Sequence, residues 1–478
     1  MAFYRGAFNL ARRNPLDLWM RGYLRSSLRW LRLAFRNGQV ADHAQGRDVR
    51  ILQGIFSGLA GRGVATVVSF VSVPLTVRYL GPERYGAWVT ISTLMAWMAL
   101  ADLGLNNSLT NAVSDGYAKD RRDLAQSYVS AAFWSLTGIA VVLALIFFSV
   151  WPMVPWDHVF NVHSEQARKE IGPSVAVAFA IFVLNFPVSI VAKIYGAYQE
   201  VPKGNAWSAT ANLLSLAALV TVTKLRGGLV FLVIAVSGSL LLVNAASAVW
   251  LFGWAKPWLF PHPSRVTWSA VQKLLSFGGL FFLIQMSALV LFQTDNLIIA
   301  HYMGAAAVTP YSVTWRLFSY ASIFQVLAGS SFWPAYAEAF SRGDGEWVRR
   351  RFRMNLRISL VSTLALALPF VAFGKWIIQE WAGSAAVPSA GLLLWMGVWS
   401  LIFSAMSAQS CLLAASGRIK GQTIYSIAAS VVNLVLSIVL IQRVGLVGVI
   451  MGTVGAFAIC VIVPQSFEVQ RSTDHRVK

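Results

Sequence analysis

The sequence predicts an all-α integral membrane protein with about twelve transmembrane helices in two six-helix bundles around a central cavity, plus an N-terminal amphipathic helix at the membrane surface. Hydrophobic residues make up 57% of the 478 residues and only 12% are charged. Soluble domains carry about twice that share of charged residues. A membrane-spanning helix needs about 20 mostly apolar residues, and twelve segments of the chain meet this requirement.

Short polar connectors separate the twelve apolar segments. The predicted spans are 54–77, 86–108, 128–151, 174–195, 207–223, 229–253, 277–302, 306–337, 356–378, 388–413, 423–441 and 446–466. The eighth segment is too long for one straight span. We expect Pro310 and Pro334 to mark its irregular start and end, because proline interrupts the hydrogen bonding of a helix.

The basic arm before the first span, residues 1–50, contains ten arginines and no lysine. Between residues 20 and 36, arginines recur every three or four residues, as on one face of a helix. Such a helix would bind the anionic lipids of the cytoplasmic leaflet. A disordered basic tail that only sets the orientation of the protein is the alternative.

The distribution of basic residues predicts the topology. Of the 39 lysines and arginines, 28 lie in connectors on one side of the predicted spans, 8 lie on the other side, and Arg62, Lys193 and Arg316 lie within spans. Basic residues concentrate on the cytoplasmic side of membrane proteins. Both termini are therefore predicted to be cytoplasmic. The net charge of +20 reflects this topology and does not indicate nucleic-acid binding.

An internal repeat divides the chain into two halves. Tyr79-Leu80-Gly81 ends the first span and Tyr302-Met303-Gly304 ends the seventh, 223 residues later. Six spans per half give both halves the same orientation, as in transporters built from parallel repeats. The predicted organisation is an arm (1–50), an N-terminal bundle (51–254), a cytoplasmic linker (255–275), a C-terminal bundle (276–466) and a cytoplasmic tail (467–478).

Each half carries an arginine and an aspartate inside adjacent spans. Arg62 and Asp102 lie at similar predicted depths, as do Asp295 and Arg316. Charges inside a membrane are costly, so they either pair with one another or serve a function. As ion pairs, they would only lock each hairpin. As functional groups, the arginines would attract an anion and the aspartates would bind a coupling proton or cation.

Lys193 is a third candidate anion contact. It lies near the cytoplasmic end of its span, a position that also favours a side chain extended toward the membrane surface.

No motif for catalysis, nucleotide binding or metal binding is present. The longest outside connector, about residues 152–173, is too short to hold the acid/base machinery of a membrane glycan polymerase. Cys411 and Cys460 both lie in apolar segments, so neither a disulfide nor a metal site is expected. The sequence therefore predicts neither an enzyme nor a cofactor.

Two stretches resemble bacterial polysaccharide flippases, the O-antigen or oligosaccharide translocases of the multidrug/oligosaccharidyl-lipid/polysaccharide exporter superfamily. The first runs from Ser69 to Trp88 and continues with Leu100-Ala-Asp-Leu-Gly-Leu-Asn-Asn107. The second comprises Thr294-Asp295-Asn-Leu-Ile-Ile-Ala-His-Tyr-Met-Gly304 and Tyr311-Ser-Val-Thr-Trp-Arg316. The resemblance extends over about residues 51–466. The arm of about fifty residues departs from the usual family pattern, in which the first span starts near the N-terminus.

The resemblance implies export of an undecaprenyl-diphosphate-linked oligosaccharide to the periplasmic leaflet by alternating access, for surface polysaccharide biosynthesis. It makes Arg62 and Arg316 candidate diphosphate or acidic-sugar contacts, and Asp102 and Asp295 candidate coupling or gating groups. H+ or Na+ would be the coupling ion, and a polysaccharide polymerase is a candidate partner. The alternative is a multidrug extruder of the same fold, but expulsion of cations favours a carboxylate-rich cavity. A membrane glycan polymerase or ligase and a non-transporting scaffold carry less weight.

Overall fold

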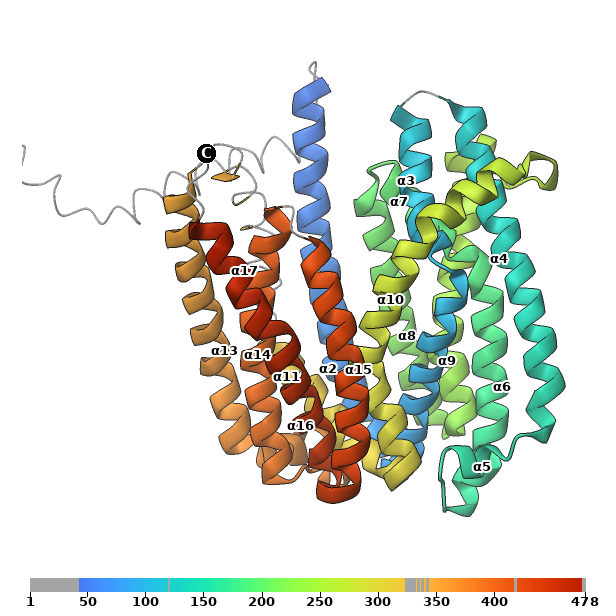
Figure 1. Cartoon of the computed structure of the whole chain (residues 1–478). Helices are drawn as coiled ribbons and strands as arrows, with labels where there is room; N and C mark the ends of the chain where they lie inside the picture. Colours follow the sequence, from blue (N-terminus) through green and yellow to red (C-terminus); the bar gives the residue numbers. More distant parts are fainter. Residues whose placement is uncertain are drawn as a thin grey trace, which may run out of the picture.

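The computed structural model describes residues 43–118, 121–322, 332, 336, 339–340, 344–416 and 419–474. Every regular element in these residues is a helix, and the long helices run side by side (Figure 1). This confirms the predicted all-α class. The amphipathic helix predicted between residues 20 and 36 lies outside the described residues, and the first described helix begins at His43, inside the predicted arm.

The longer helices follow the predicted apolar segments. They are α2 (His43–Met98), α3 (Leu105–Ala118), α4 (Arg122–Val150), α6 (Glu165–Val188), α7 (Ile190–Ala197), α8 (Val201–Leu225), α9 (Gly228–Trp250), α10 (Trp268–Met303), α11 (Ala305–Ala321), α13 (Gly345–Ala382), α14 (Ala390–Ala415), α15 (Ile419–Val444), α16 (Leu446–Phe457) and α17 (Val463–Asp474). Short helices lie between them: η1 (Ala99–Asp102), η2 (Trp151–Met153), α5 (Trp156–Val159), η3 (Leu251–Ala255), η4 (Pro257–Leu259), η5 (Pro263–Arg265), η6 (Ser384–Ala386) and η7 (Ala458–Ile462).

Nine helical stretches in the described part of the chain are long and apolar enough to cross a membrane. The first of them, Phe56–Asp102, contains a break at Gly81, where the chain reverses direction (Figure 1). The fold is therefore that of a multi-pass membrane protein. The predicted total of twelve spans stays a prediction.

The two ends of the helix bundle differ in the connectors that they hold. One end, here called the hinge end, holds the reversal inside α2, α5, the α8–α9 turn and the turn between α10 and α11, and lies at the bottom of Figure 1. The opposite end, here called the terminal end, holds the start of α2, the connector between α9 and α10, and the last turns of α17 (Figure 1). Successive long helices therefore alternate between the two ends.

The glycines of the predicted repeat adopt almost the same backbone conformation. Gly81 has φ 75° and ψ 172°, and Gly304 has φ 86° and ψ 161°. Only glycine adopts this region without strain. Each glycine reverses the chain between two long helices, which supports the repeat predicted from the sequence.

The two reversals pack against each other at the hinge end. The Cα atom of Gly86 lies so close to the carbonyl group of Ala305 that an added Cβ would overlap it. The hydroxyl of Thr309 donates to the carbonyl oxygen of Pro82 at 2.5 Å. In addition, α2 packs against α11 as well as α8, and α10 packs against α3 as well as α15. The first helix of each half thus contacts the other half.

Two predicted spans are interrupted where the sequence predicted continuous helices. The span predicted at 86–108 breaks after Met98 into η1 and α3, with Leu103 and Gly104 at positive φ. The span predicted at 174–195 divides at Ser189 into α6 and α7, two residues after Pro187, which has no N–H to donate. The two breaks adjoin, because Asn106 donates to the hydroxyl of Ser189 at 3.1 Å.

The start of the eighth predicted span is also corrected. Gly304, and not Pro310, marks its irregular start, because Pro310 lies inside α11. Pro310 is the sixth residue of α11, so the helix continues although the N–H that would donate to the carbonyl oxygen of Ala306 is missing. The predicted end at Pro334 lies outside the described residues.

Candidate functional site

A cavity between the two halves of the chain consists of two connected chambers. The arginine chamber has a volume of about 670 Å³ and the hydroxyl chamber about 460 Å³. Both are lined by Ser69, Gln293, Trp315 and Arg316, so they meet at these residues. These volumes lie in the range of small-molecule binding sites, roughly 300–1,000 Å³.

The arginine chamber contains both arginines that the sequence places inside spans. Arg62 comes from α2 and Arg316 from α11, and both side chains are exposed to the cavity. In the described part of the chain, neither makes an ion pair. Two unpaired guanidinium groups in a cavity attract an anion, and a guanidinium binds phosphate oxygens with paired hydrogen bonds.

Aromatic side chains form one wall of the arginine chamber. The indole of Trp315 stacks on that of Trp399, with ring centroids 5.7 Å apart, and Trp399 also contacts Phe403 at 5.9 Å. The chamber is further lined by Phe318 and Tyr320. The arginines therefore lie beside apolar surface, which suits an amphipathic ligand.

The hydroxyl chamber lies closer to Gly81 along α2 and closer to Gly304 along α11. Its lining is rich in uncharged polar side chains from α2, α8, α10 and α11: Ser69, Ser72, Thr76, Ser92, Thr93, Ser215, Gln293, Asn296 and Ser312. Most of these residues were not singled out by the sequence. Their helices contain other polar residues as well, and which of them face the cavity depends on helix rotation.

Asp295 lines the hydroxyl chamber and is 96% buried, since 4% of it is exposed. Its Oδ2 atom accepts hydrogen bonds from the hydroxyls of Tyr311, at 2.5 Å, and Thr453, at 3.3 Å. Arg316 also lines this chamber, yet the ion pair with Asp295 that their depths allowed does not form. The sequence missed the two actual partners, although Tyr311 follows the second repeat glycine.

Asp102 and Lys193 line neither chamber. Asp102 accepts a hydrogen bond from the backbone N–H of Gly104, at 2.8 Å, and so stabilises the turn that starts α3. Lys193 donates to the side-chain oxygen of Asn107 at 2.7 Å. The predicted pair of Arg62 and Asp102 does not form either. Of the five predicted site residues, the structure brings together Arg62, Arg316 and Asp295.

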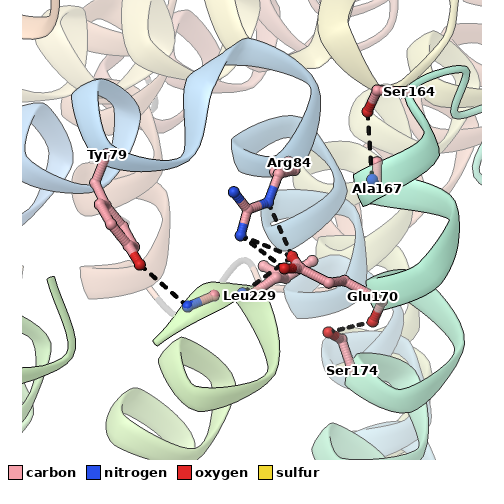
Figure 2. Close-up of polar contacts among 8 residues, drawn as sticks. Tyr79, Arg84, Ser164, Ala167, Glu170, Ser174 and Leu229 are labelled. Carbon is pink, nitrogen blue, oxygen red and sulfur yellow. Dashed lines mark hydrogen bonds and ion pairs between the residues drawn. The ribbon is translucent and has the colours of Figure 1, made fainter. Parts of the chain in front are cut away.

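Polar contacts along α2 join the two halves from the level of the hydroxyl chamber to the hinge end. Arg78 donates to the carbonyl oxygen of Glu380, and the indole N–H of Trp381 donates to the carbonyl oxygen of Phe70 at 2.9 Å. Both contacts join α2 to α13. Figure 2 shows a third contact at this end, in which the guanidinium of Arg84 points at the carboxylate of Glu170.

In the described part of the chain, no group of three or more histidine, cysteine or acidic side chains is arranged to hold a metal ion. The cavity is therefore best described by its arginines, its aromatic wall and its hydroxyl groups.

Comparisons with known proteins agree with this geometry. The family model described as polysaccharide biosynthesis protein matches residues 51–340, which is more than half of the chain. The chain belongs to this family. The matched region holds most residues that line the two chambers, including both arginines.

Relatives of this polysaccharide biosynthesis family member are named as exporters. A Salmonella typhi protein named as an O-antigen transporter is 22% identical over 57% of this chain, and the match spans 61% of that relative's length. A Yersinia pseudotuberculosis protein named as an O-antigen export protein is 22% identical over 88% of this chain and 96% of its own length.

The fold of this family member is similar to that of a solved transporter. The inward-facing conformation of a multidrug resistance MATE family transporter of the MOP superfamily superposes with a TM-score of 0.72. The superposition covers 93% of this chain and 98% of the other, at 13% identity. At that identity, the likeness establishes the fold alone.

Proposed function

We propose that this protein moves an undecaprenyl-diphosphate-linked oligosaccharide from the cytoplasmic to the periplasmic leaflet of a bacterial inner membrane. The observation that carries the proposal is that Arg62 and Arg316 lie in a cavity between the two halves and make no ion pair with any residue that the structure describes. A diphosphate carries the charge that these groups attract and the oxygens that they bind. Transport, and not catalysis, is the role that the names of the relatives support.

The charge distribution supports an orientation with both termini in the cytoplasm. Basic residues gather at the terminal end, for example Arg121 and Arg122 at the start of α4 and Lys256 between α9 and α10. The positive-inside rule assigns this end to the cytoplasm. The basic arm of residues 1–50 would then meet the anionic cytoplasmic leaflet.

The contacts at the hinge end support transport by alternating access. The contacts of Arg78 with Glu380 and of Thr309 with Pro82 join the two halves on the side that we assign to the periplasm, while Arg62 lies in the cavity on the terminal side. The cavity would therefore load from the cytoplasm. Rocking of the halves, residues 51–254 against 276–466 joined by the linker 255–275, would break the hinge-end contacts and release the substrate to the periplasm.

Asp295 is the best candidate for ion coupling. Its carboxylate lies in the cavity and has one oxygen without a hydrogen-bond partner in the described structure. Binding of H+ or Na+ there would change the charge of the chamber and bias the conformation. We assign Asp102 a gating role, because it stabilises the helix break before α3. Lys193 would contact the anionic group of the substrate only while the substrate enters near α7.

A multidrug extruder of the same fold is the second candidate, favoured only by the MATE-like fold. Amphipathic cations would be repelled by Arg62 and Arg316. A polysaccharide polymerase that receives the flipped saccharide is the partner that the proposed function implies.

The test is deletion of the gene, followed by measurement of surface polysaccharide and of undecaprenyl-diphosphate-linked saccharides, with a panel of cationic drugs in parallel. The proposal expects loss of surface glycan and accumulation of the lipid-linked species on the cytoplasmic leaflet. Intact glycan with increased drug sensitivity would instead establish the extruder.

A further inference from the structure

Two buried acceptor atoms on residues that line the hydroxyl chamber lack a hydrogen-bond donor in the described structure. They are Oδ1 of Asp295 and Oδ1 of Asn296. The amide group of Asn296 is held by its other end, because Nδ2 donates to the hydroxyl of Thr93 at 3.3 Å. A buried acceptor without a partner costs about 1–3 kcal/mol. A ligand in the chamber that donates hydrogen bonds would satisfy these atoms once either side chain turned toward it.

The hydroxyl side chains around these atoms add further acceptors. Thr76 donates its hydrogen to the carbonyl oxygen of Ser72 at 2.7 Å, and Ser92 donates to that of Trp88 at 2.9 Å. A hydroxyl that donates within its own helix presents only lone pairs to the cavity. These hydroxyls add acceptor oxygens to the chamber, beside the donor groups that Gln293 and Arg316 carry.

A saccharide matches this lining, because its hydroxyls both donate and accept hydrogen bonds. Each sugar hydroxyl has an O–H to donate, and an acetamido group adds an N–H. The ring faces of Trp88 and Trp315 also line the chamber, and aromatic faces carry partial negative charge that attracts the C–H groups of a sugar ring. A carboxylate on the sugar would be repelled by Asp295, so the chamber suits a neutral sugar.

The order of the two chambers fixes the direction of the substrate. Arg316 lies where the chambers meet, and Arg62 lies on the terminal side of it along α2. A diphosphate bound by both arginines would direct its sugar toward the hinge end. We propose that the hydroxyl chamber is the saccharide subsite and that Asn296 is a specificity-determining residue for the sugar next to the diphosphate. This inference rests on the proposed function.

The experiment compares two probes on the full-length protein in nanodiscs: undecaprenyl diphosphate, and the lipid-linked saccharide extracted from the deletion strain. The wild-type protein should bind the saccharide-bearing probe about tenfold more tightly, a factor that corresponds to about 1.4 kcal/mol. Asn296→Leu should reduce this ratio to about one without changing the affinity for undecaprenyl diphosphate. Arg316→Ala should weaken the binding of both probes by the same factor.

Ser215→Phe is a second variant that fills the chamber from α8 without removing either orphan acceptor, and it should also abolish the preference for the saccharide. The matched control is Asn212→Leu, because Asn212 donates only to the carbonyl oxygen of Ser208 in its own helix and lines neither chamber. Unchanged ratios in both Asn296→Leu and Ser215→Phe would overturn the inference. Failure of the wild-type protein to bind either probe would instead refute the proposed function.

Discussion

Arg84 and Glu170 form a two-pronged ion pair at the hinge end, with hydrogen bonds of 2.9 and 3.0 Å. Only 12% and 20% of these side chains are exposed. Glu170 also accepts a hydrogen bond from the N–H of Leu229 at 3.1 Å, as Figure 2 shows. One carboxylate thus connects the α2 reversal, α6 and the α8–α9 turn.

Loss of this pair should destabilise the protein. Arg84→Ala leaves the largely buried charge of Glu170 without its partner, which costs about 3 kcal/mol. We expect a clearly lower melting temperature in detergent. The control is Lys169→Ala on α6, the helix that carries Glu170. Lys169 pairs with Glu165, but the two side chains are 74% and 84% exposed, and exposed ion pairs contribute little to stability. Equal shifts for the two variants would contradict this assignment.

The repeat glycines make a second stability prediction. At Gly81 an added Cβ meets no atom within 4 Å, so Gly81→Ala tests backbone strain alone, which costs about 1–3 kcal/mol in this region. Gly63→Ala in the same helix also meets no atom but has ordinary helical backbone, so it should be neutral or slightly stabilising. The measurement is thermal unfolding, and equal stability of the two variants would show that Gly81 is not strained.

The lengths of the apolar runs were sufficient to predict where most helices lie, because burial in lipid requires about 20 apolar residues whatever their order. The breaks at Gly104 and Ser189 were not predicted. They depend on local features, namely the acceptor that Asp102 offers to the N–H of Gly104 and the N–H that Pro187 lacks. Such features do not change the hydropathy of a segment.

The sequence indicated the depth of the site residues in the membrane but not the direction in which their side chains point. Depth in the membrane follows from position along a span, and Arg62 and Arg316 do share a chamber. The direction of a side chain around the helix axis changes by about 100° with each residue. Depth alone therefore could not show that Asp295 meets Tyr311 and not Arg316, or that Asp102 faces its own backbone.

Glu200 provides a prediction on pH. It lies between α7 and α8 and forms ion pairs with Lys256, at 2.9 Å, and Lys203, at 3.2 Å. Burial alone would raise its pKa, but the hydrogen bonds and charges of these lysines outweigh burial and lower the pKa below its ordinary value of 4.5. A lowered pKa in the folded state stabilises the protein above the ordinary value, and this contribution is lost as the pH falls through the folded pKa.

Glu200→Gln should therefore reduce the melting temperature at neutral pH. The difference from the wild-type protein should narrow below about pH 4.5 as the wild-type carboxylate takes up its proton. Thermal unfolding across a pH series measures this. A difference that stays constant down to acid pH would mean that Glu200 acts through packing and not through its charge.

Arg316 should be required for export but not for folding. Arg316→Ala removes a charged donor that we place on the diphosphate, a loss of about 1.5–3 kcal/mol of binding, and should abolish surface glycan while the protein stays in the membrane. Arg316→Lys keeps the positive charge but loses the planar guanidinium that donates paired hydrogen bonds, so it should retain part of the activity. Lys375→Ala, at an exposed position outside both chambers, is the control. Normal glycan with Arg316→Ala would refute its role.

Asp295 should determine whether transport responds to an ion gradient. Asp295→Asn keeps the size of the side chain but cannot take up a proton or balance a cation, so gradient energy would no longer bias the two conformations. In proteoliposomes with the lipid-linked saccharide, the wild-type rate should fall when nigericin or monensin dissipates the coupling gradient. The rate of Asp295→Asn should be the same with and without the gradient.

Tyr311→Phe separates the charge of Asp295 from its hydrogen bonds. It removes the donor at 2.5 Å but leaves the carboxylate and its bond from Thr453. We expect this variant to keep its response to the gradient, with a changed rate. A preserved response in Asp295→Asn would show that coupling takes place elsewhere. A response lost in both variants would mean that the hydrogen-bonded geometry of the pair, and not the charge of Asp295 alone, carries the coupling.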